Sequence, residues 1–158
     1  MTIDCRIADG IGTVTVASRD AADRARLEEF LRAPELKGVV VRLAGNPAGD
    51  ATALSQTIAA SPVPTAAAIR GDCAGADLEI ARACDFRYAS APDSDAERQA
   101  TEFLRALTAG RSAALVRTVM TSIRNAARMP LGEALAEETS LFCQAARRLI
   151  AAGEGEPR

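Results

Sequence analysis

The sequence contains no histidine, and this absence restricts its possible chemistry more than any other feature of its composition. Histidine is the commonest general base and metal ligand in proteins, and it activates most serine and cysteine nucleophiles. Proton transfer would therefore fall to carboxylates, to thiols, or to Tyr88 and Lys37, the only tyrosine and the only lysine. We expect no bound metal.

The chain has few cysteines, and their spacing argues against a structural role. Cys5, Cys73, Cys84 and Cys143 form no CxxC motif and have apolar neighbours. This pattern predicts buried, reduced thiols and neither a zinc site nor a disulfide framework. Without a histidine or a nearby lysine, nothing in the sequence would lower the pKa of Cys73, so we interpret it as a core residue.

Aromatic residues and excess positive charge are also scarce. Only 3% of the residues are aromatic, and Lys and Arg (19) are fewer than Asp and Glu (21), which excludes a typical nucleic-acid surface. No run of about 18 apolar residues is present, and the N-terminus lacks a signal-peptide pattern. We therefore expect a cytoplasmic protein that contacts neither nucleic acid nor membrane.

The chain length and the hydrophobic content are sufficient for one compact domain. The chain has 158 residues, 48% of them hydrophobic, and no linker or repeat of defined period divides it. We expect a single domain over residues 1–158, with an α/β core in residues 1–91, a helical part in 92–152 and a frayed tail in 153–158.

The first half alternates between strand and helix patterns. Apolar and polar residues alternate on both sides of Asp9-Gly10, which predicts a hairpin. The β-branched run KGVVVRL is typical of a strand buried on both faces of a parallel sheet. The expected strands are 2–7, 12–17, 37–43, 65–69 and 86–89, the expected helices are 20–32 and 77–83, and a loop is expected between the strands at 37–43 and 65–69. This order predicts an α/β fold with parallel strands.

The second half is helical. We expect helices over residues 96–109, 112–127 and 132–152, broken at Gly110 and at Met129-Pro130. In the last helix, Leu135, Phe142 and Ile150 belong to an apolar stripe that could pack on the domain, on another subunit, or on both.

One segment between an expected strand and an expected helix is a glycine-containing turn. Residues 66–79 pass from small apolar residues through Gly-Asp-Cys-Ala-Gly-Ala-Asp into a helix pattern. A glycine turn that opens a helix aims backbone N–H groups at one point, which suits an anion or a developing oxyanion. The same segment could equally serve as a packing elbow.

Residues 62–90, PVPTAAAIRGDCAGADLEIARACDFRYAS, resemble the signature segment of the enoyl-CoA hydratase/isomerase, or crotonase, superfamily. Eight residues fall in register with it without a gap: Gly71, Gly75, Glu79, Ala81, Cys84, Asp85, Ala89 and Ser90. KGVVVRLAG resembles the strand before the superfamily's first oxyanion loop, and LGEALAEETSLFCQAA resembles its C-terminal helices, which cover the acyl site and help form trimers. The implied fold is a truncated crotonase-like ββα spiral core with C-terminal helices.

The resemblance implies a site for an acyl thioester. By register, the N–H of Ala76 would be one oxyanion donor, beside Gly75, and Glu79 matches one of two glutamates that transfer protons. The segment around Gly49 and Asp50 is the nearest match to the first oxyanion loop, which makes Ala48 the other donor. The substrate would be an acyl-CoA or a carrier-bound thioester, with coenzyme A as part of the substrate and no separate cofactor, and a homo-oligomer of trimer or hexamer type is implied.

The sequence also departs from the superfamily. The helix after the first loop is either missing or reduced to residues 52–59, and a turn of the spiral after Ser90 is missing. Without gaps, Gln99 stands where the second glutamate would be, with Glu97 nearby. Asp77 replaces a glycine; pointing inward it would repel an enolate, so we expect it to point outward and cap the helix.

Two hypotheses follow. In the first, the chain stabilises an enolate as an isomerase or hydratase, with isomerisation the easier reaction because one carboxylate can carry a proton between two carbons. In the second, it is a degenerate homologue that keeps the fold and serves as an accessory or partner-binding subunit.

Overall fold

The strands form one sheet whose order follows the chain. The computed structural model describes residues 3–16, 21–45, 49–91 and 95–153. The sheet runs β1-β2-β3-β4-β5, with β1 antiparallel to β2 and every other neighbouring pair parallel. The strands are β1 (Asp4–Ala8), β2 (Ile11–Thr15), β3 (Gly38–Leu43), β4 (Thr65–Ile69) and β5 (Phe86–Ala89).

Six helices accompany the sheet. They are α1 (Ala21–Leu31), α2 (Thr52–Ala59), α3 (Gly75–Ala83), α4 (Ala96–Thr108), α5 (Ala113–Ala126) and α6 (Leu131–Gly153). Every expected strand and helix is confirmed, with boundaries that differ by a few residues, and of the two alternatives for residues 52–59 the structure has the short helix α2. The α/β fold class is likewise confirmed.

The hairpin forms where the sequence places it. Asp9 and Gly10 both have positive φ, 53° and 77°, between β1 and β2. Two consecutive residues of positive φ are typical of the tight turn whose twist matches that of the paired strands. Asp9 tolerates this conformation because its side chain is short and polar.

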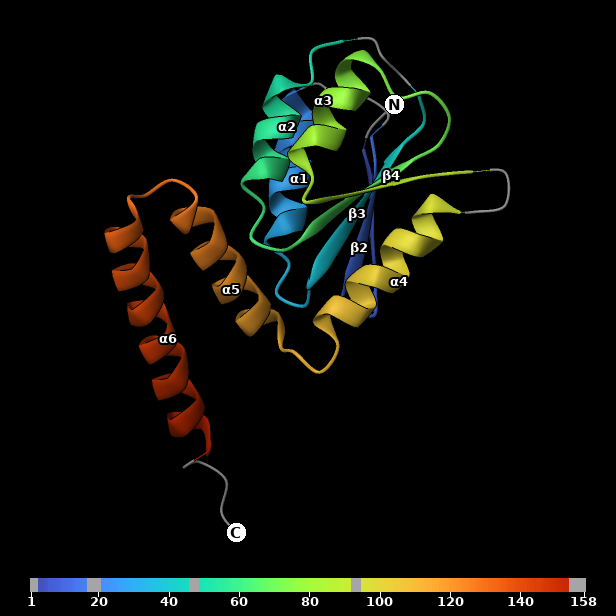
Figure 1. Cartoon of the computed structure of the whole chain (residues 1–158). Coiled ribbons are helices and arrows are strands. Elements are labelled where there is room, and N and C mark those ends of the chain that lie inside the picture. Colours follow the sequence, from blue (N-terminus) through green and yellow to red (C-terminus); the bar gives the residue numbers. More distant parts are fainter. Residues whose placement is uncertain (1–2, 17–20, 46–48, 92–94, 154–158) are drawn as a thin grey trace.

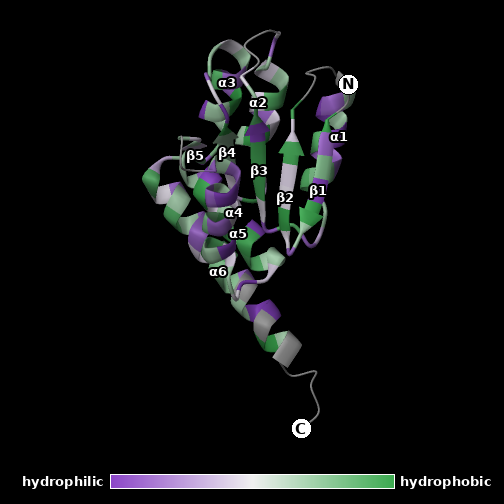
Figure 2. Ribbon diagram, turned by 90° about the vertical axis from the view of Figure 1, so that its right-hand side faces the viewer, coloured by the Kyte–Doolittle hydropathy of each residue, from purple (hydrophilic) through white to green (hydrophobic). Residues whose placement is uncertain are grey.

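Helices cover both faces of the sheet (Figure 1). Along β3, Val39 and Val41 belong to the cluster that α1, α2 and α3 bury, whereas Val40 belongs to the cluster beneath α4. Alternate residues of a strand point to opposite faces, so a continuous apolar run suits a strand covered on both sides. Figure 2 shows this hydrophobic centre, with hydrophilic residues on the outer surfaces of the helices.

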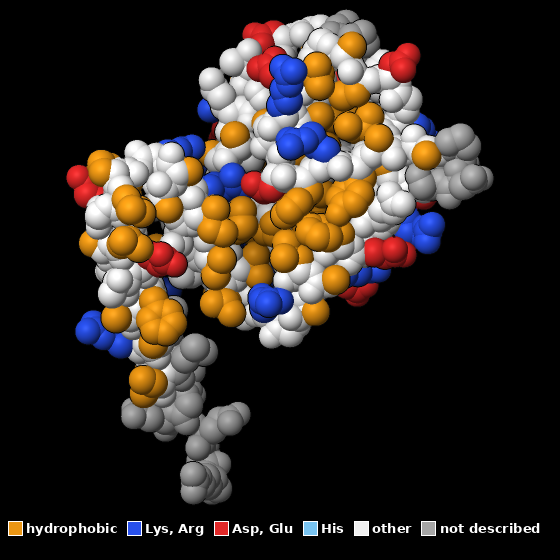
Figure 3. Space-filling view, viewed as in Figure 1, with side chains coloured by type: hydrophobic (Ala, Val, Ile, Leu, Met, Phe, Trp, Pro, Cys, Tyr) orange, Lys and Arg blue, Asp and Glu red, His pale blue; other side chains and the backbone are white. Residues whose placement is uncertain are grey.

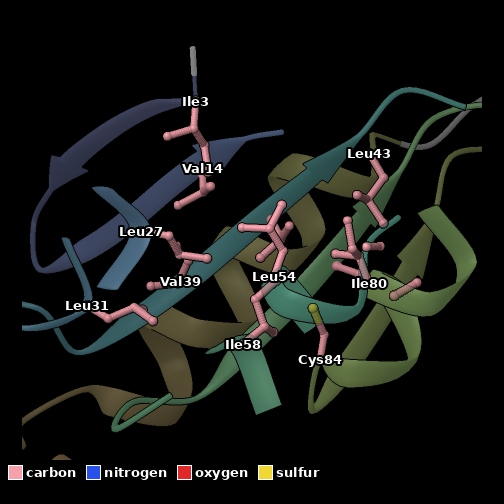
Figure 4. Packing of buried hydrophobic residues seen from close by; sticks show 14 of the residues in the cluster. Ile3, Val14, Leu27, Leu31, Val39, Leu43, Leu54, Ile58, Ile80 and Cys84 are labelled. Carbon is pink, nitrogen blue, oxygen red and sulfur yellow. The ribbon is translucent and has the colours of Figure 1, made fainter. Parts of the chain in front are cut away.

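The larger hydrophobic cluster holds α1, α2 and α3 against one face of the sheet. Leu27 from α1, Leu54 and Ile58 from α2 and Ile80 from α3 share this cluster with residues of β3 (Figure 4). Each is at most 1% exposed. Burying a side chain of this size contributes roughly 1.5–3 kcal/mol, so this cluster holds α2 and α3 firmly against the sheet.

The last two helices have a different relation to the core. α5 is anchored, because Val116 is buried in the main cluster and Arg117 donates to the carbonyls of Leu31 and Ala33. α6 packs along α5 and stands away from the sheet (Figure 1). Phe142 and Ile150 on α6 are exposed, so this part of the stripe does not pack on the domain, and its packing on another subunit stays a prediction.

The four cysteines are free thiols. Cys84 is buried and Cys5 and Cys73 are partly buried, but Cys143 on α6 is exposed, so the expectation of burial is wrong for Cys143. Among the described residues, no helix is long and apolar enough to cross a membrane.

Candidate functional site

The candidate site lies at the carboxyl ends of the parallel strands. β4 ends at Ile69, and the chain then turns through Gly71, with φ of 78°, and enters α3 at Gly75, with φ of 51°. In parallel α/β sheets, ligands bind in the crevice beyond the carboxyl ends of the strands. The strand, turn and helix that the sequence predicts are therefore at an edge suited to binding.

The amide of Ala76 lies in the first turn of α3. The amides of a helix's first turn have no acceptor within the helix, and they carry the positive end of its dipole. Ala74, the residue before the helix, has an extended backbone and supplies no side-chain cap. The Ala76 side chain is buried.

Glu79 lies one turn further along α3 and is held by a residue that the sequence analysis missed. The Ser55 hydroxyl, on α2, lies 3.0 Å from Glu79 Oε1 and 3.0 Å from the Thr52 carbonyl oxygen, and can donate its proton to either. Ser55 is buried while Glu79 is exposed. A serine between Leu54 and Ile58 on the buried face of a short helix is the signal that could have identified it.

Asp77 does not point outward, so that prediction is wrong. Its side chain is only 2% exposed, and its Oδ2 accepts a hydrogen bond of 3.0 Å from the amide of Gly45. Gly45 follows β3, has φ of 81°, and a Cβ there would lie 3.0 Å from the Asp72 carbonyl oxygen. The two loops approach too closely for a larger residue, and Asp77 ties them together at the candidate site.

The first oxyanion loop is described only in part. Ala48 lies outside the described residues. Gly49 is exposed with φ of 92°, and Asp50 Oδ1 accepts from the amide of Thr52 at 2.9 Å, where it caps the start of α2. Hydrogen bonds from Thr52 lower the pKa of Asp50. Asp50 therefore joins the loop to the start of α2.

Asp85, another residue of the signature, has structural partners. Its Oδ2 accepts from the amide and hydroxyl of Thr65, at 2.8 and 2.9 Å, and from Arg124 at 3.1 Å. Arg124 also donates to the Ser61 carbonyl at 2.7 Å. Asp85 thus joins the start of β4, the start of β5 and α5, and it supports the site from the opposite end of the strands.

The structure does not bring a second carboxylate to Glu79 from α4. Glu97 forms an ion pair of 3.1 Å with Arg42, on β3. The backbone N–H of Gln99 donates to the backbone carbonyl of Asp95 in the first turn of α4. Glu97 and Arg42 line a small cavity of about 80 Å³ at the same edge of the sheet, on its α4 side, together with Ala44, Ala68 and Ser90.

The Cys73 thiol lies beside the turn and is partly buried. Cys73 packs against the main core cluster. Burial, with Asp77 nearby, raises the pKa of the Cys73 thiol. The thiol is therefore protonated at neutral pH, whereas nucleophilic attack would need the thiolate.

Solved structures share this architecture across most of the chain. An enoyl-CoA hydratase/isomerase family protein from Silicibacter pomeroyi aligns with a TM-score of 0.73 and 17% identity, covering 92% of this chain and 98% of its own. A protein assigned as an enoyl-CoA hydratase from Streptomyces coelicolor aligns with a TM-score of 0.70 and 18% identity, covering 98% of this chain and 92% of its own. The chain has the crotonase fold.

A third solved structure agrees, an enoyl-CoA hydratase/isomerase family assignment from Hyphomonas neptunium, with a TM-score of 0.66 and 16% identity over 90% of this chain and 88% of its own. No family model matches the sequence, and no curated protein matches it. At these identities the likeness shows the fold and specifies no substrate. The fold expected from the resemblance is thus confirmed.

Proposed function

We propose that this crotonase-like protein binds an acyl thioester at the first turn of α3 and moves a proton within it. The observation that carries the proposal is the pairing of the Ala76 amide with Glu79 one turn later, at the carboxyl edge of the sheet. The amide would donate to the thioester oxygen as that oxygen gains charge. The substrate would be an acyl-CoA or a carrier-bound thioester, with no separate cofactor.

Of the two reactions, double-bond isomerisation is the one that a single carboxylate can catalyse. The Glu79 carboxylate would take a proton from the carbon beside the thioester, and the C–H electron pair would move into the enolate. The proton on Glu79 would then return to the far end of the conjugated system, so one side chain serves as base and then as acid. Hydration would need a second group to activate water, and Glu97 is engaged by Arg42.

The hydrogen bond from Ser55 supports this role of Glu79. An exposed glutamate on a helix samples several rotamers, whereas a hydrogen bond from a buried hydroxyl limits them. Restricting the base to one orientation is the positioning that proton transfer requires. The resemblance also leads us to propose a homo-oligomer, with Ala48 as the other oxyanion donor and Gly75, Gly49 and Asp50 beside the bound thioester.

The test is an assay of isomerase and hydratase activity on short unsaturated acyl-CoA thioesters. We expect isomerase activity, with Glu79→Gln lowering kcat by about 100-fold or more. Glu102→Gln is the matched control, because Glu102 is an exposed glutamate on α4 whose side chain is 62% exposed. Equal activity of Glu79→Gln and wild type would contradict the proposal. If the wild type instead hydrates the substrate, and both Glu79→Gln and Glu97→Gln lose this activity, the reaction is hydration and not isomerisation.

A further inference from the structure

A groove between α4 and α5 lies at the end of the sheet opposite to the candidate site. Pro64, just before β4, and Asp85, just before β5, line the groove, whereas the proposed thioester site is at the carboxyl ends of these strands. The five residues of β4 separate the two ends of the sheet by roughly 16 Å. The groove is therefore a separate place in the molecule, and the proposed chemistry does not use it.

The lining of the groove is mostly apolar. Leu107 comes from the end of α4, Leu115, Val119 and Ile123 come from α5, and Phe86 comes from β5. The four aliphatic side chains are each more than 40% exposed. Figure 3 shows the corresponding hydrophobic area in the middle of the molecule. Contiguous apolar patches of this kind on a protein surface mark binding sites.

The groove has room for one extended chain. It encloses about 420 Å³, which is within the range of roughly 300–1,000 Å³ for small-molecule sites. Leu115, Val119 and Ile123 recur every four residues, so they form a stripe that extends for roughly 12 Å along α5. Over this length the volume leaves a cross-section of about 35 Å², less than half of the ~80–110 Å² of a helix with its side chains. A narrow apolar molecule fits this space, and a helix of another protein does not enter it.

Arg111 lies at the end of the groove where α4 ends and α5 begins. Its Nη1 donates to the carbonyls of Leu107, at 2.7 Å, and Ala109, at 3.4 Å, and these hydrogen bonds hold the guanidinium at the rim. No described residue accepts from its Nε or Nη2, and no described acid forms an ion pair with it. A guanidinium with donors to spare is suited to binding a carboxylate.

The other polar side chains in the lining already have partners. The Thr108 hydroxyl donates to a carbonyl of the preceding turn, at 2.8 Å, and Asp85 is paired with Arg124 at 3.1 Å. Arg124 is near the other end of α5 from Arg111, so the Asp85 end of the groove has a neutralised pair and the Arg111 end has a free positive charge. The groove therefore favours an apolar molecule with one negative charge at the Arg111 end.

We propose that the groove between α4 and α5 binds a free fatty acid of about ten carbons, with its carboxylate on Arg111 and its tail along Leu115, Val119 and Ile123. Each bond of an extended chain advances ~1.2 Å, so about ten carbons span the stripe. This inference goes beyond the proposed function and does not depend on thioester chemistry, because the two sites are at opposite ends of the strands.

The first test is calorimetric titration with hexanoate, octanoate, decanoate, dodecanoate and tetradecanoate, each below its micelle concentration. Each added methylene should tighten binding about two- to fourfold while it is buried in the groove. We expect this gain to stop beyond about ten carbons, where the chain passes the end of the stripe. The absence of saturable binding would overturn the proposal, and so would an equal gain for every methylene up to tetradecanoate.

Two pairs of variants place the ligand. Val119→Glu should weaken decanoate binding at least tenfold because it puts a charge where the tail lies. Thr121→Glu is the control, since Thr121 is exposed on the opposite side of α5, and it should bind like the wild type. Circular dichroism of each variant should match that of the wild type. Unchanged binding to Val119→Glu would overturn the proposal.

The second pair tests the charge. Arg111→Gln should weaken octanoate binding about fivefold and leave binding of the uncharged 1-octanol unchanged. Arg128→Gln removes an exposed arginine outside the groove and should change neither. Equal octanoate affinity in Arg111→Gln and wild type would overturn the assignment of the carboxylate to Arg111.

Discussion

The Ser55 hydroxyl lies 3.0 Å from Glu79 Oε1, and this contact joins α2 to the helix that begins at the candidate site. The two residues are 24 positions apart, and the sequence gives no local reason for their pairing. α2 and α3 pack side by side through Leu54, Ile58 and Ile80, so the hydrophobic core determines where the polar contact forms.

Ser55→Ala should lower kcat about tenfold and leave KM nearly unchanged, because it frees the Glu79 carboxylate without removing it. A tenfold change corresponds to ~1.4 kcal/mol of transition-state stabilisation. Ser55→Thr keeps the hydroxyl and should retain most of the activity. Steady-state kinetics of the three proteins test this; equal losses in both variants would indicate a packing effect instead.

Asp77→Asn should raise turnover. The amide oxygen of asparagine can still accept from the Gly45 amide, but a neutral group replaces the buried carboxylate next to Ala76, the proposed oxyanion donor. With an effective dielectric constant of ~20, one charge nearby costs an oxyanion about 1 kcal/mol or more. The comparison is kcat on one thioester, and a lower rate in Asp77→Asn would show that the charge assists the reaction.

Asp77→Gly should lower stability, since it removes the link between the two loops. Leaving a buried group without its partner costs about 1–3 kcal/mol. Urea unfolding of Asp77→Gly and Asp77→Asn measures the difference. We expect Asp77→Asn to be the more stable of the two, and the opposite order would argue against the Gly45 contact.

Arg124→Met should also destabilise the fold, because it leaves Asp85 without its cation while keeping most of the apolar bulk. The two side chains are 18% and 24% exposed, so the expected loss is about 1–2 kcal/mol, below that of a fully buried pair. In a double-mutant cycle with Asp85→Asn, the two losses should sum to more than the loss of the double variant. Additive losses would mean that the pair contributes nothing.

The thiols should differ in reactivity. Burial raises the pKa of Cys84 to about 12, so it stays protonated at pH 8, whereas Cys143 is exposed. Iodoacetamide at pH 8 should label Cys143 first and Cys84 last, as mass spectrometry of peptides would show. Since the folded pKa of Cys84 is raised, its contribution to stability is complete below pH 9 and is lost as the pH rises toward 12. Early labelling of Cys84 would contradict its burial.

The fold could be predicted from the sequence to the level of each element except α2, for which a loop and a short helix were both open. Alternation around Asp9-Gly10, the run at residues 37–43 and the breaks at Gly110 and Pro130 are local signals, and local signals define strands and helix ends. The turn into α3 was also predicted, because glycine and small residues are needed wherever backbones approach closely.

The orientation of Asp77 could not be predicted in this way. A carboxylate in the first turn of a helix usually faces water, and only the approach of Gly45 from another strand makes an inward position favourable. The Ser55 contact and the exposure of Phe142 are similar cases, since both depend on how distant helices pack. Residue types therefore indicated the chemistry of the site, and tertiary packing determined its geometry.

The most direct test of the account is calorimetric titration of the protein with acetyl-CoA, with coenzyme A alone and Glu79→Gln in parallel. The account predicts saturable binding of acetyl-CoA, weaker binding of coenzyme A because it lacks the carbonyl that the Ala76 amide would hold, and nearly unchanged binding to Glu79→Gln. Equal binding of acetyl-CoA and coenzyme A, or no binding of either, would contradict a thioester site at the start of α3.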